Sequence, residues 1–230
     1  MATRPVFIPG HERLTVTVRP VDFAWHPGLS ATQKKKSVVS LHDAAKRQLE
    51  LEKILEISTK SENSAGVELS AFNLSFTTKK NRIKVSVESA FQGSKILQSG
   101  GPYSDLYGTD SKSAKIDVRI RNGGRLLGFE FFGVKWPTEP VTAFYDWVYL
   151  KALQSNPALA SELENFDAFT DIEFNPEKSL NCQAYSAALY VTLSRANLIH
   201  EALQSQESFL ETVVKIPGYG VTSSRALGLI

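Results

Sequence analysis

The sequence predicts a mainly helical α+β fold, and three observations support this class. Apolar residues recur at helical spacing in several segments, short apolar runs of strand length lie between them, and Gly, Pro and polar residues separate the two kinds. No internal repeat is visible. With 230 residues and a hydrophobic fraction of 42%, the chain suits one globular domain, or a core with an N-terminal extension.

The N-terminal part is expected to combine short strands with one long helix. Residues 1–12 contain Pro and Gly and are expected to be loose. Residues 14–18 alternate between apolar and polar side chains, which predicts a strand. Ser30 is a candidate N-cap for a helix to about residue 50, because Val38 and Leu41 begin a helical apolar pattern. Extended segments are also expected at 54–58, 69–76 and 83–85, with a polar loop up to Gly66.

The C-terminal part is expected to be richer in helices. A helix over 86–98 is predicted to stop at Gly100 and Gly101. Residues 102–125 look like a loop with a short helix at 111–118, and the apolar stretch 126–136 looks like strand. Further helices are expected at 139–154, 157–165, 181–195 and 198–214, with an extended segment at 169–174 and a Gly/Ser-rich tail after Pro217.

Composition argues against several classes of protein. Cys182 is the only cysteine, so no intrachain disulfide can form, which fits a reducing cytoplasm. The four histidines share no ligand spacing, and no metal site is predicted. No apolar run of about 18 residues and no apolar signal region occur, so neither a membrane span nor export is expected. A net charge of +2 is too small to argue nucleic-acid binding by itself.

Basic residues nevertheless gather in three places. Such clusters are either solvated faces or parts of a track for phosphates. They comprise Lys34, Lys35 and Lys36 with Lys46 and Arg47; Lys79, Lys80, Arg82 and Lys84; and Arg119, Arg121 and Arg125.

The most informative segment is 85–97. On a helix, Glu88, Gln92 and Lys95 follow i, i+4 and i+7 spacing and form one polar stripe. With Ser86 as N-cap, Glu88 would lie in the first turn, where the helix dipole favours a carboxylate. This stripe is either the floor of a site for a polar, anionic ligand or the ordinary polar face of a surface helix.

The same segment resembles the signature of the NADAR family, named for its association with NAD and ADP-ribose. That signature reads roughly Ser-x-Glu-His-x-Phe-Gln-x-x-Lys. Glu88, Phe91, Gln92 and Lys95 keep the pattern, whereas Ser89 stands in the place of its His. Weaker matches at 57–60, 66–73 and 135–157 follow in the family's order, so the resemblance extends over roughly residues 55–195.

Within that family, the chain looks most like the variant paired with DarT-type toxins, which ADP-ribosylate guanine in DNA. Three stretches carry this likeness, 23–29, 101–107 and 169–176. The family usually has an Asp-x-x-Trp-Gly loop after a conserved Glu, but no Trp follows Glu173 here, so the residue that closes that side of the pocket is not identified. The resemblance implies an extension (1–50) packed on the core, a catalytic domain (51–215) and a C-terminal tail (216–230).

The resemblance implies cleavage of an N-glycosidic bond to ribose, without a cofactor. Such a reaction passes through an oxocarbenium-like state, which a carboxylate can stabilise while it deprotonates water. Glu88 is expected to fill this role. Lys60 is expected either to form a Schiff base with ring-opened ribose or to protonate the leaving group.

Further residues are candidates for binding. ADP-ribose is expected at Asn73, Gln92, Lys95, Tyr103, Ser104, Asp105, Trp136 and Glu173, and DNA at Trp25, His26, Lys34, Lys35 and Lys36. Trp136 has an alternative reading as a core anchor at a helix start, Glu173 as a strand-end charge, and Trp25 as a plug between extension and core. Cys182 is expected to be a small buried hydrophobe.

Three functions follow as hypotheses. The first is an antitoxin hydrolase that removes ADP-ribose from guanine in DNA, opposing a DarT-type toxin that it could also contact. The second is an N-glycosidase for a small aminated ribose phosphate. The third is a non-catalytic module that binds ADP-ribose or masks the toxin.

Overall fold

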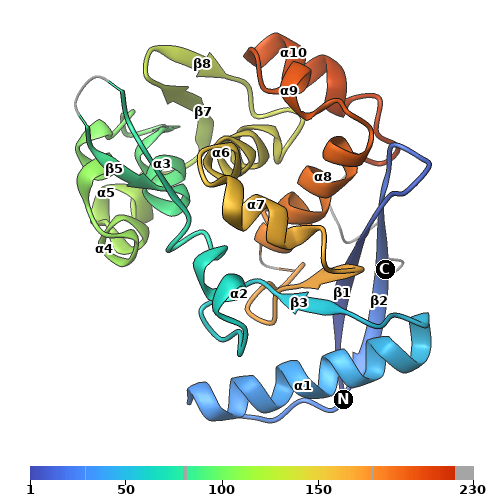
Figure 1. Cartoon of the computed structure of the whole chain (residues 1–230). Helices are drawn as coiled ribbons and strands as arrows, with labels where there is room; N and C mark the ends of the chain where they lie inside the picture. Colours follow the sequence, from blue (N-terminus) through green and yellow to red (C-terminus); the bar gives the residue numbers. More distant parts are fainter. Residues whose placement is uncertain (29, 80–81, 178, 221–230) are drawn as a thin grey trace.

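The computed structural model describes residues 1–28, 30–79, 82–177 and 179–220. Helices and short strands alternate along the chain, as the predicted α+β class requires, and Figure 1 shows their arrangement. In chain order the elements are β1 (Ala2–Pro9), β2 (Val16–Phe23), α1 (Ala31–Leu49), β3 (Ile54–Glu56), α2 (Ser64–Glu68), β4 (Ser75–Thr77), β5 (Lys84–Ser86), α3 (Val87–Gly93), β6 (Lys95–Leu97), η1 (Ser104–Gly108), α4 (Ser111–Ile116), α5 (Val118–Arg121), β7 (Leu126–Phe131), β8 (Val134–Trp136), α6 (Ala143–Gln154), α7 (Pro157–Leu163), β9 (Ala168–Thr170), α8 (Gln183–Arg195), α9 (Ile199–Ala202) and α10 (Gln206–Val213).

The largest sheet has the strand order β2-β1-β9-β3. Strand β1 pairs antiparallel with β2 along its whole length, from Ala2↔Phe23 to Pro9↔Val16, and β9 runs parallel to β3. The expectation that residues 1–12 are loose was therefore wrong. Val6 and Phe7 are buried in this sheet, and that burial outweighs the local turn signals of Pro and Gly.

Helix α1 confirms the predicted N-cap, since the Ser30 hydroxyl accepts a hydrogen bond from the Gln33 backbone N–H. Its apolar face buries Val38 and Leu41 in a hydrophobic cluster that also contains Ile54 of β3. Figure 1 shows α1 beside β3 at one end of the molecule, with α10 and the β7–β8 hairpin at the other. The first 50 residues thus share a sheet and a hydrophobic cluster with later segments.

The larger hydrophobic cluster surrounds α6. Phe144, Tyr149 and Leu153 of this helix are almost completely buried, and α6 packs against α3 and α8. The β6-β7-β8 sheet adds Phe129, whose ring lies 4.6 Å from that of Phe144. This aromatic packing holds α3, which carries the signature segment, against the core.

The signature helix is shorter than predicted. Helix α3 ends at Gly93, and Lys95–Leu97 form strand β6, which pairs antiparallel with β7. Strand pairing with a segment some thirty residues away decides this boundary, and local periodicity carries no signal of it. Four other local expectations need correction. Helix α2 forms inside the expected loop before Gly66, and turns replace the extended segment over most of 69–76. The expected loop 102–125 contains the helical turns η1 and α5, and the predicted helix 198–214 is broken between α9 and α10.

The turn that contains Tyr219 is attached to α6 through the buried carboxyl group of Asp146. Asp146 accepts hydrogen bonds from the hydroxyls of Thr142, Ser186 and Tyr219, at 2.7, 2.6 and 2.8 Å. Burial raises the pKa of Asp146 to about 6 despite these donors. The carboxylate therefore carries its charge inside the core at pH 7.5.

Tyr219→Phe is expected to lower the free energy of unfolding by about 1–3 kcal/mol at pH 7.5, because it removes one donor from a buried carboxylate. The loss should shrink as the pH falls below about 6, where Asp146 becomes protonated. Urea unfolding at the two pH values measures both effects. Tyr190→Phe is the matched control, since the Tyr190 hydroxyl makes no hydrogen bond to any described residue. Equal losses in the two variants would contradict the assignment.

Candidate active site

A cavity of about 420 Å³ opens between α3, the turn after β3 and the loop that follows β9. Polar and charged side chains from segments far apart in the sequence converge on it. Its lining includes Thr59, Ser70, Phe72, Glu88, Phe91, Gln92, Lys95, Lys115, Tyr145, Asp171, Glu173, Phe174, Asn181 and Gln183. Four of the predicted site residues therefore meet here, namely Glu88, Gln92, Lys95 and Glu173.

The polar stripe survives the early end of the helix. The Gln92 amide donates to Glu88 Oε1 at 2.9 Å, and Lys95 Nζ donates to Gln92 Oε1 at 2.7 Å. Ser86 caps α3 as predicted, with its hydroxyl accepting from the Ser89 backbone N–H. Glu88 is only 7% exposed, so its carboxylate is held in the cavity wall.

Lys95 is the partly buried amine of the cavity. Its Nζ lies 4.6 Å from the centre of the Phe91 ring. The pKa of Lys95 is lowered to about 8, mainly by burial; Glu88 opposes this shift and the nearby Lys115 adds to it. A fraction of about a tenth of this amine is then neutral at pH 7. Lys95 can hold an anion as an ammonium ion or act as a nucleophile as a free amine.

Asp171 is a cavity residue that the sequence analysis missed. It follows β9, is 8% exposed, and its Oδ1 accepts the backbone N–H groups of Glu173 and Phe174 at 3.0 and 3.2 Å. Burial and the nearby Glu56 raise the pKa of Asp171 well above its ordinary value. A buried carboxylic acid that faces a polar cavity can donate a proton.

A signal for Asp171 was present in the sequence. Asp171 and Phe174 have the Asp-x-x-aromatic spacing of the NADAR loop, with Phe in the place of Trp. The sequence analysis expected this loop after Glu173, two residues further along the chain. Phe174 lines the cavity and packs edge-on against Phe7 of β1, so it closes the side that the missing Trp had left open.

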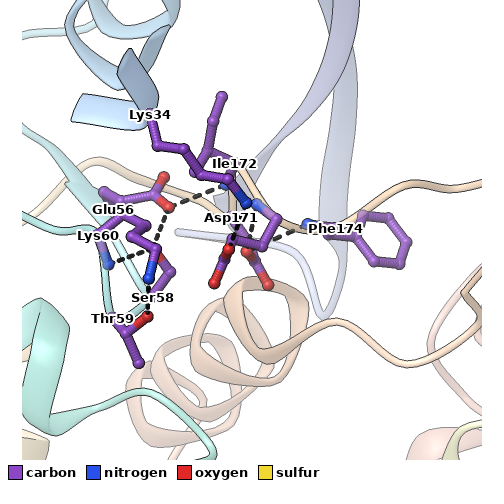
Figure 2. A network of polar contacts seen from close by, with 9 residues as sticks. Lys34, Glu56, Ser58, Thr59, Lys60, Asp171, Ile172 and Phe174 are labelled. Atoms are coloured by element: carbon purple, nitrogen blue, oxygen red, sulfur yellow. Dashed lines mark hydrogen bonds and ion pairs between the residues drawn. The ribbon is translucent and has the colours of Figure 1, made fainter. Parts of the chain in front are cut away.

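Behind this wall lies the buried carboxylate of Glu56, at the end of β3. It accepts hydrogen bonds from the Ser58 and Thr170 hydroxyls, both at 2.7 Å, and from the Ile172 backbone N–H at 2.9 Å. His42 of α1 contacts the Thr170 hydroxyl at 2.8 Å. Figure 2 shows Glu56 between Ser58, in the turn after β3, and Ile172, in the loop after β9, so that its carboxylate joins the two segments.

Helix α1 also reaches the cavity. Lys34 Nζ forms an ion pair with Glu173 Oε1 at 2.6 Å, and both side chains are partly exposed. Lys60 lies next to the cavity but does not line it, since its Nζ donates to the hydroxyl of Thr59, which does. Figure 2 shows Lys60 beside Thr59. The amine that lines the cavity is Lys95, whereas sequence reasoning had favoured Lys60 for the chemistry.

Several expected ligands of ADP-ribose lie elsewhere. Trp136 is 3% exposed and packs against Trp147 at 5.0 Å between ring centres, so it is the core anchor and not a stacking platform. Asn73 lines a separate hollow, and its amide is bonded to the Val67 carbonyl at 2.8 Å. Tyr103, Ser104 and Asp105 also lie outside the cavity lining, and Arg119 binds Asp105 and covers the Tyr103 ring.

The expected DNA-binding residues divide into two groups. His26, Lys35 and Lys36 line a second hollow of about 480 Å³ on α1, together with Arg47. Trp25 does not line this hollow but packs against Phe23 beneath the Arg4 guanidinium, as a plug between segments. Of the other basic clusters, Arg119 is paired with two aspartates, and Lys80 falls outside the described residues.

No helix among residues 1–28, 30–79, 82–177 and 179–220 is long and apolar enough to cross a membrane. In the same ranges, no group of three or more His, Cys, Asp or Glu side chains is arranged to hold a metal ion.

The fold and the cavity define an α+β protein with a partly buried site in which three carboxyl groups, side-chain amides and the partly buried amine of Lys95 converge. The model of the DarT1-associated NADAR antitoxin family matches residues 2–219, so the chain belongs to this family. A search of curated proteins found no match. The family match begins in β1 and therefore includes the strands and the helix of the N-terminal extension.

Proposed function

We propose that this protein is a glycohydrolase that removes ADP-ribose from guanine in DNA and so acts as an antitoxin against a DarT-type toxin. The observation that carries the proposal is the cavity in which Glu88, Lys95 and Asp171 meet, in a chain of the DarT1-associated antitoxin family. A volume of about 420 Å³ suits a small-molecule group, since such sites span about 300–1,000 Å³.

Each of the three groups has a role in the hydrolysis. Glu88 deprotonates a water that attacks ribose C1″, and its negative charge stabilises the oxocarbenium-like transition state. The bond between C1″ and the guanine nitrogen breaks, its electron pair goes to the nitrogen, and Asp171 supplies the proton that this nitrogen needs. Lys95 binds the pyrophosphate as a cation, held in place by Gln92. The proton that Glu88 takes from the attacking water is released to solvent, and Asp171 takes up a proton from solvent before the next turnover.

The decisive assay incubates purified protein with single-stranded DNA that carries ADP-ribosyl guanine, in a buffer without added metal. Free ADP-ribose and unmodified DNA should appear together in equal amounts, which mass spectrometry of both products measures. Unmodified DNA and DNA ADP-ribosylated at thymine serve as substrate controls. Intact substrate after many equivalents of folded protein would reject the hydrolase.

Each of the two alternative functions predicts a different experimental result. An N-glycosidase for a small aminated ribose phosphate would cleave that metabolite and leave modified DNA intact. A binding module would retain ADP-ribose without cleavage, and Glu88→Gln would then still protect cells from the toxin. Direct contact with the toxin is a separate property, which co-purification of the two proteins measures.

The basic hollow on α1 supports a path for the DNA backbone beside the cavity. Two segments link the hollows. Helix α1 places Lys34 against Glu173 of the cavity lining and Lys35 in the basic hollow, and the segment after β3 places Thr59 in the cavity and Glu62 in the basic hollow. Lys35 and Lys36 form no ion pair with any described residue, so their charges are available to phosphates.

Combined Lys35→Ser and Lys36→Ser substitution should weaken binding of modified single-stranded DNA and reduce the slope of log Kd against log salt concentration by about 1.4, since each phosphate contact on a single strand contributes about 0.7. Fluorescence anisotropy across a salt series measures this slope. Lys46→Ser is the control, because Lys46 lies on the same helix outside the hollow. An unchanged slope would exclude this path, whereas turnover of ADP-ribosyl guanosine alone should stay at the wild-type rate.

A further inference from the structure

Glu56 is buried behind the wall that carries Asp171 and does not line the cavity. Only 2% of Glu56 is exposed, yet both of its carboxylate oxygens are satisfied by the hydroxyls of Ser58 and Thr170 and by the Ile172 N–H. Three donors around one carboxylate favour its ionised form, even though burial raises the pKa of Glu56. A buried carboxylate with three donors but no cation among its bonded partners needs an explanation beyond stability.

The placement of these donors means that Glu56 fixes the backbone on both sides of Asp171. Thr170 and Ile172, the two neighbours of Asp171 in the chain, are both bonded to Glu56. The loop segment that carries Asp171 is therefore fixed on both sides by one carboxylate. In the turn after β3, Ser58 donates to Glu56 and also accepts the Lys60 backbone N–H at 3.1 Å, so the turn beside the cavity is fixed by the same carboxylate.

The charge of Glu56 acts on Asp171 in addition to this geometry. Two neighbouring carboxyl groups in a buried site cannot both ionise readily, so one of them keeps a proton. Three hydrogen-bond donors reach Glu56, whereas Asp171 Oδ1 accepts two backbone N–H groups and the Gln183 side chain also favours the ionised form of Asp171. Burial and the charge of Glu56 outweigh these donors, since the pKa of Asp171 is raised well above its ordinary value. The ionised form therefore belongs to Glu56 and the proton to Asp171.

We infer that Glu56 is a positioning residue that holds the Asp171 loop in place and keeps the Asp171 carboxyl group in its proton-donating form at neutral pH. This inference rests on the proposed hydrolysis, in which Asp171 protonates the leaving nitrogen. His42 completes the network from α1: with its Nε2 proton it donates to the Thr170 hydroxyl, which in turn donates to Glu56. Burial lowers the pKa of His42 to about 4, so the ring is neutral at pH 7.

The other charged groups around Asp171 are unchanged by the test. Glu173 raises the pKa of Asp171 and is itself paired with Lys34. The positive charge of the Arg4 guanidinium interacts with Asp171. Cys182, Tyr145 and Tyr149 are buried, and the pKa of each is raised well above its ordinary value, so they remain neutral. Glu88 and Lys95 face the same cavity from α3 and β6.

Glu56→Gln tests the inference, because the substitution removes the charge and keeps the shape. The introduced amide oxygen can still accept from Ser58 and Ile172, and its NH₂ group can donate to Thr170, whose hydroxyl then donates to the other tautomer of His42. The titration midpoint of Asp171, followed by carboxyl ¹³C NMR and assigned with Asp171→Asn, should fall by about one pH unit or more. The basic limb of the kcat/KM profile against pH should move down by the same amount.

The control is Glu211→Gln, which removes an exposed carboxylate of α10 and should shift neither quantity. An unchanged Asp171 midpoint with a uniform loss of rate at every pH would reduce Glu56 to a structural role and overturn the inference. If Glu56→Gln does not fold, Ser58→Ala, which removes one donor, should give a smaller shift in the same direction. The NMR titration needs no turnover, so absence of ADP-ribose release by the wild type would reject the proposed function without deciding this inference.

Discussion

Glu88→Gln is expected to lower kcat for release of ADP-ribose from modified DNA by about 10³-fold, the largest effect of any single substitution in the cavity. The amide can neither take a proton from water nor stabilise positive charge at ribose C1″. The Gln92 amide, which donates to Glu88 Oε1, can donate to the oxygen of the introduced amide in the same way, so the cavity should keep its shape. Kd for ADP-ribose should change by less than about threefold.

Rapid-quench kinetics on a modified oligonucleotide measure the chemical step, and calorimetry with ADP-ribose measures binding. Glu211→Gln, an exposed carboxylate on α10, is the matched control and should retain the wild-type rate. Wild-type turnover by Glu88→Gln would remove Glu88 from the chemistry. A parallel loss of binding and rate would instead show that Glu88 acts by holding the ligand.

Lys95→Met is expected to lower kcat/KM by between about 10-fold and 100-fold, because it removes a charge-assisted contact to a phosphate and preserves the length of the side chain. Lys60→Met should cost less than about threefold, since Lys60 does not line the cavity and only donates to the hydroxyl of Thr59, which does. Comparison of the two variants in one assay decides which lysine serves the site. Equal losses, or a larger loss in Lys60→Met, would return the role to Lys60.

Borohydride treatment during turnover separates direct attack by water from a Schiff base. The pKa of about 8 gives Lys95 a neutral fraction that could attack ring-opened ribose. Direct hydrolysis with Glu88 as base predicts no covalent adduct on either lysine. A reduced adduct on a Lys95 peptide, seen by mass spectrometry, would replace water attack by a covalent mechanism and leave the substrate assignment intact.

Sequence reasoning identified what depends on local chemistry. The Ser30 and Ser86 caps, the long helix α1 and the line from Glu88 through Gln92 to Lys95 are local in sequence, because capping and helical spacing act over a few residues. The NADAR signature lies in the same segment, and the family match over residues 2–219 confirms the resemblance. The cap, the signature and the predicted α+β class were therefore readable without coordinates.

Only the tertiary structure decided which distant groups face that segment. Strand β6 ends the signature helix because it pairs with β7, and Trp136 enters the core because aromatic rings from α6 surround it. Asp171 becomes a buried acid because the parallel pairing of β3 with β9 brings Glu56 behind it. Pairing and burial depend on contacts between residues far apart in the chain, for which periodicity and composition carry no signal.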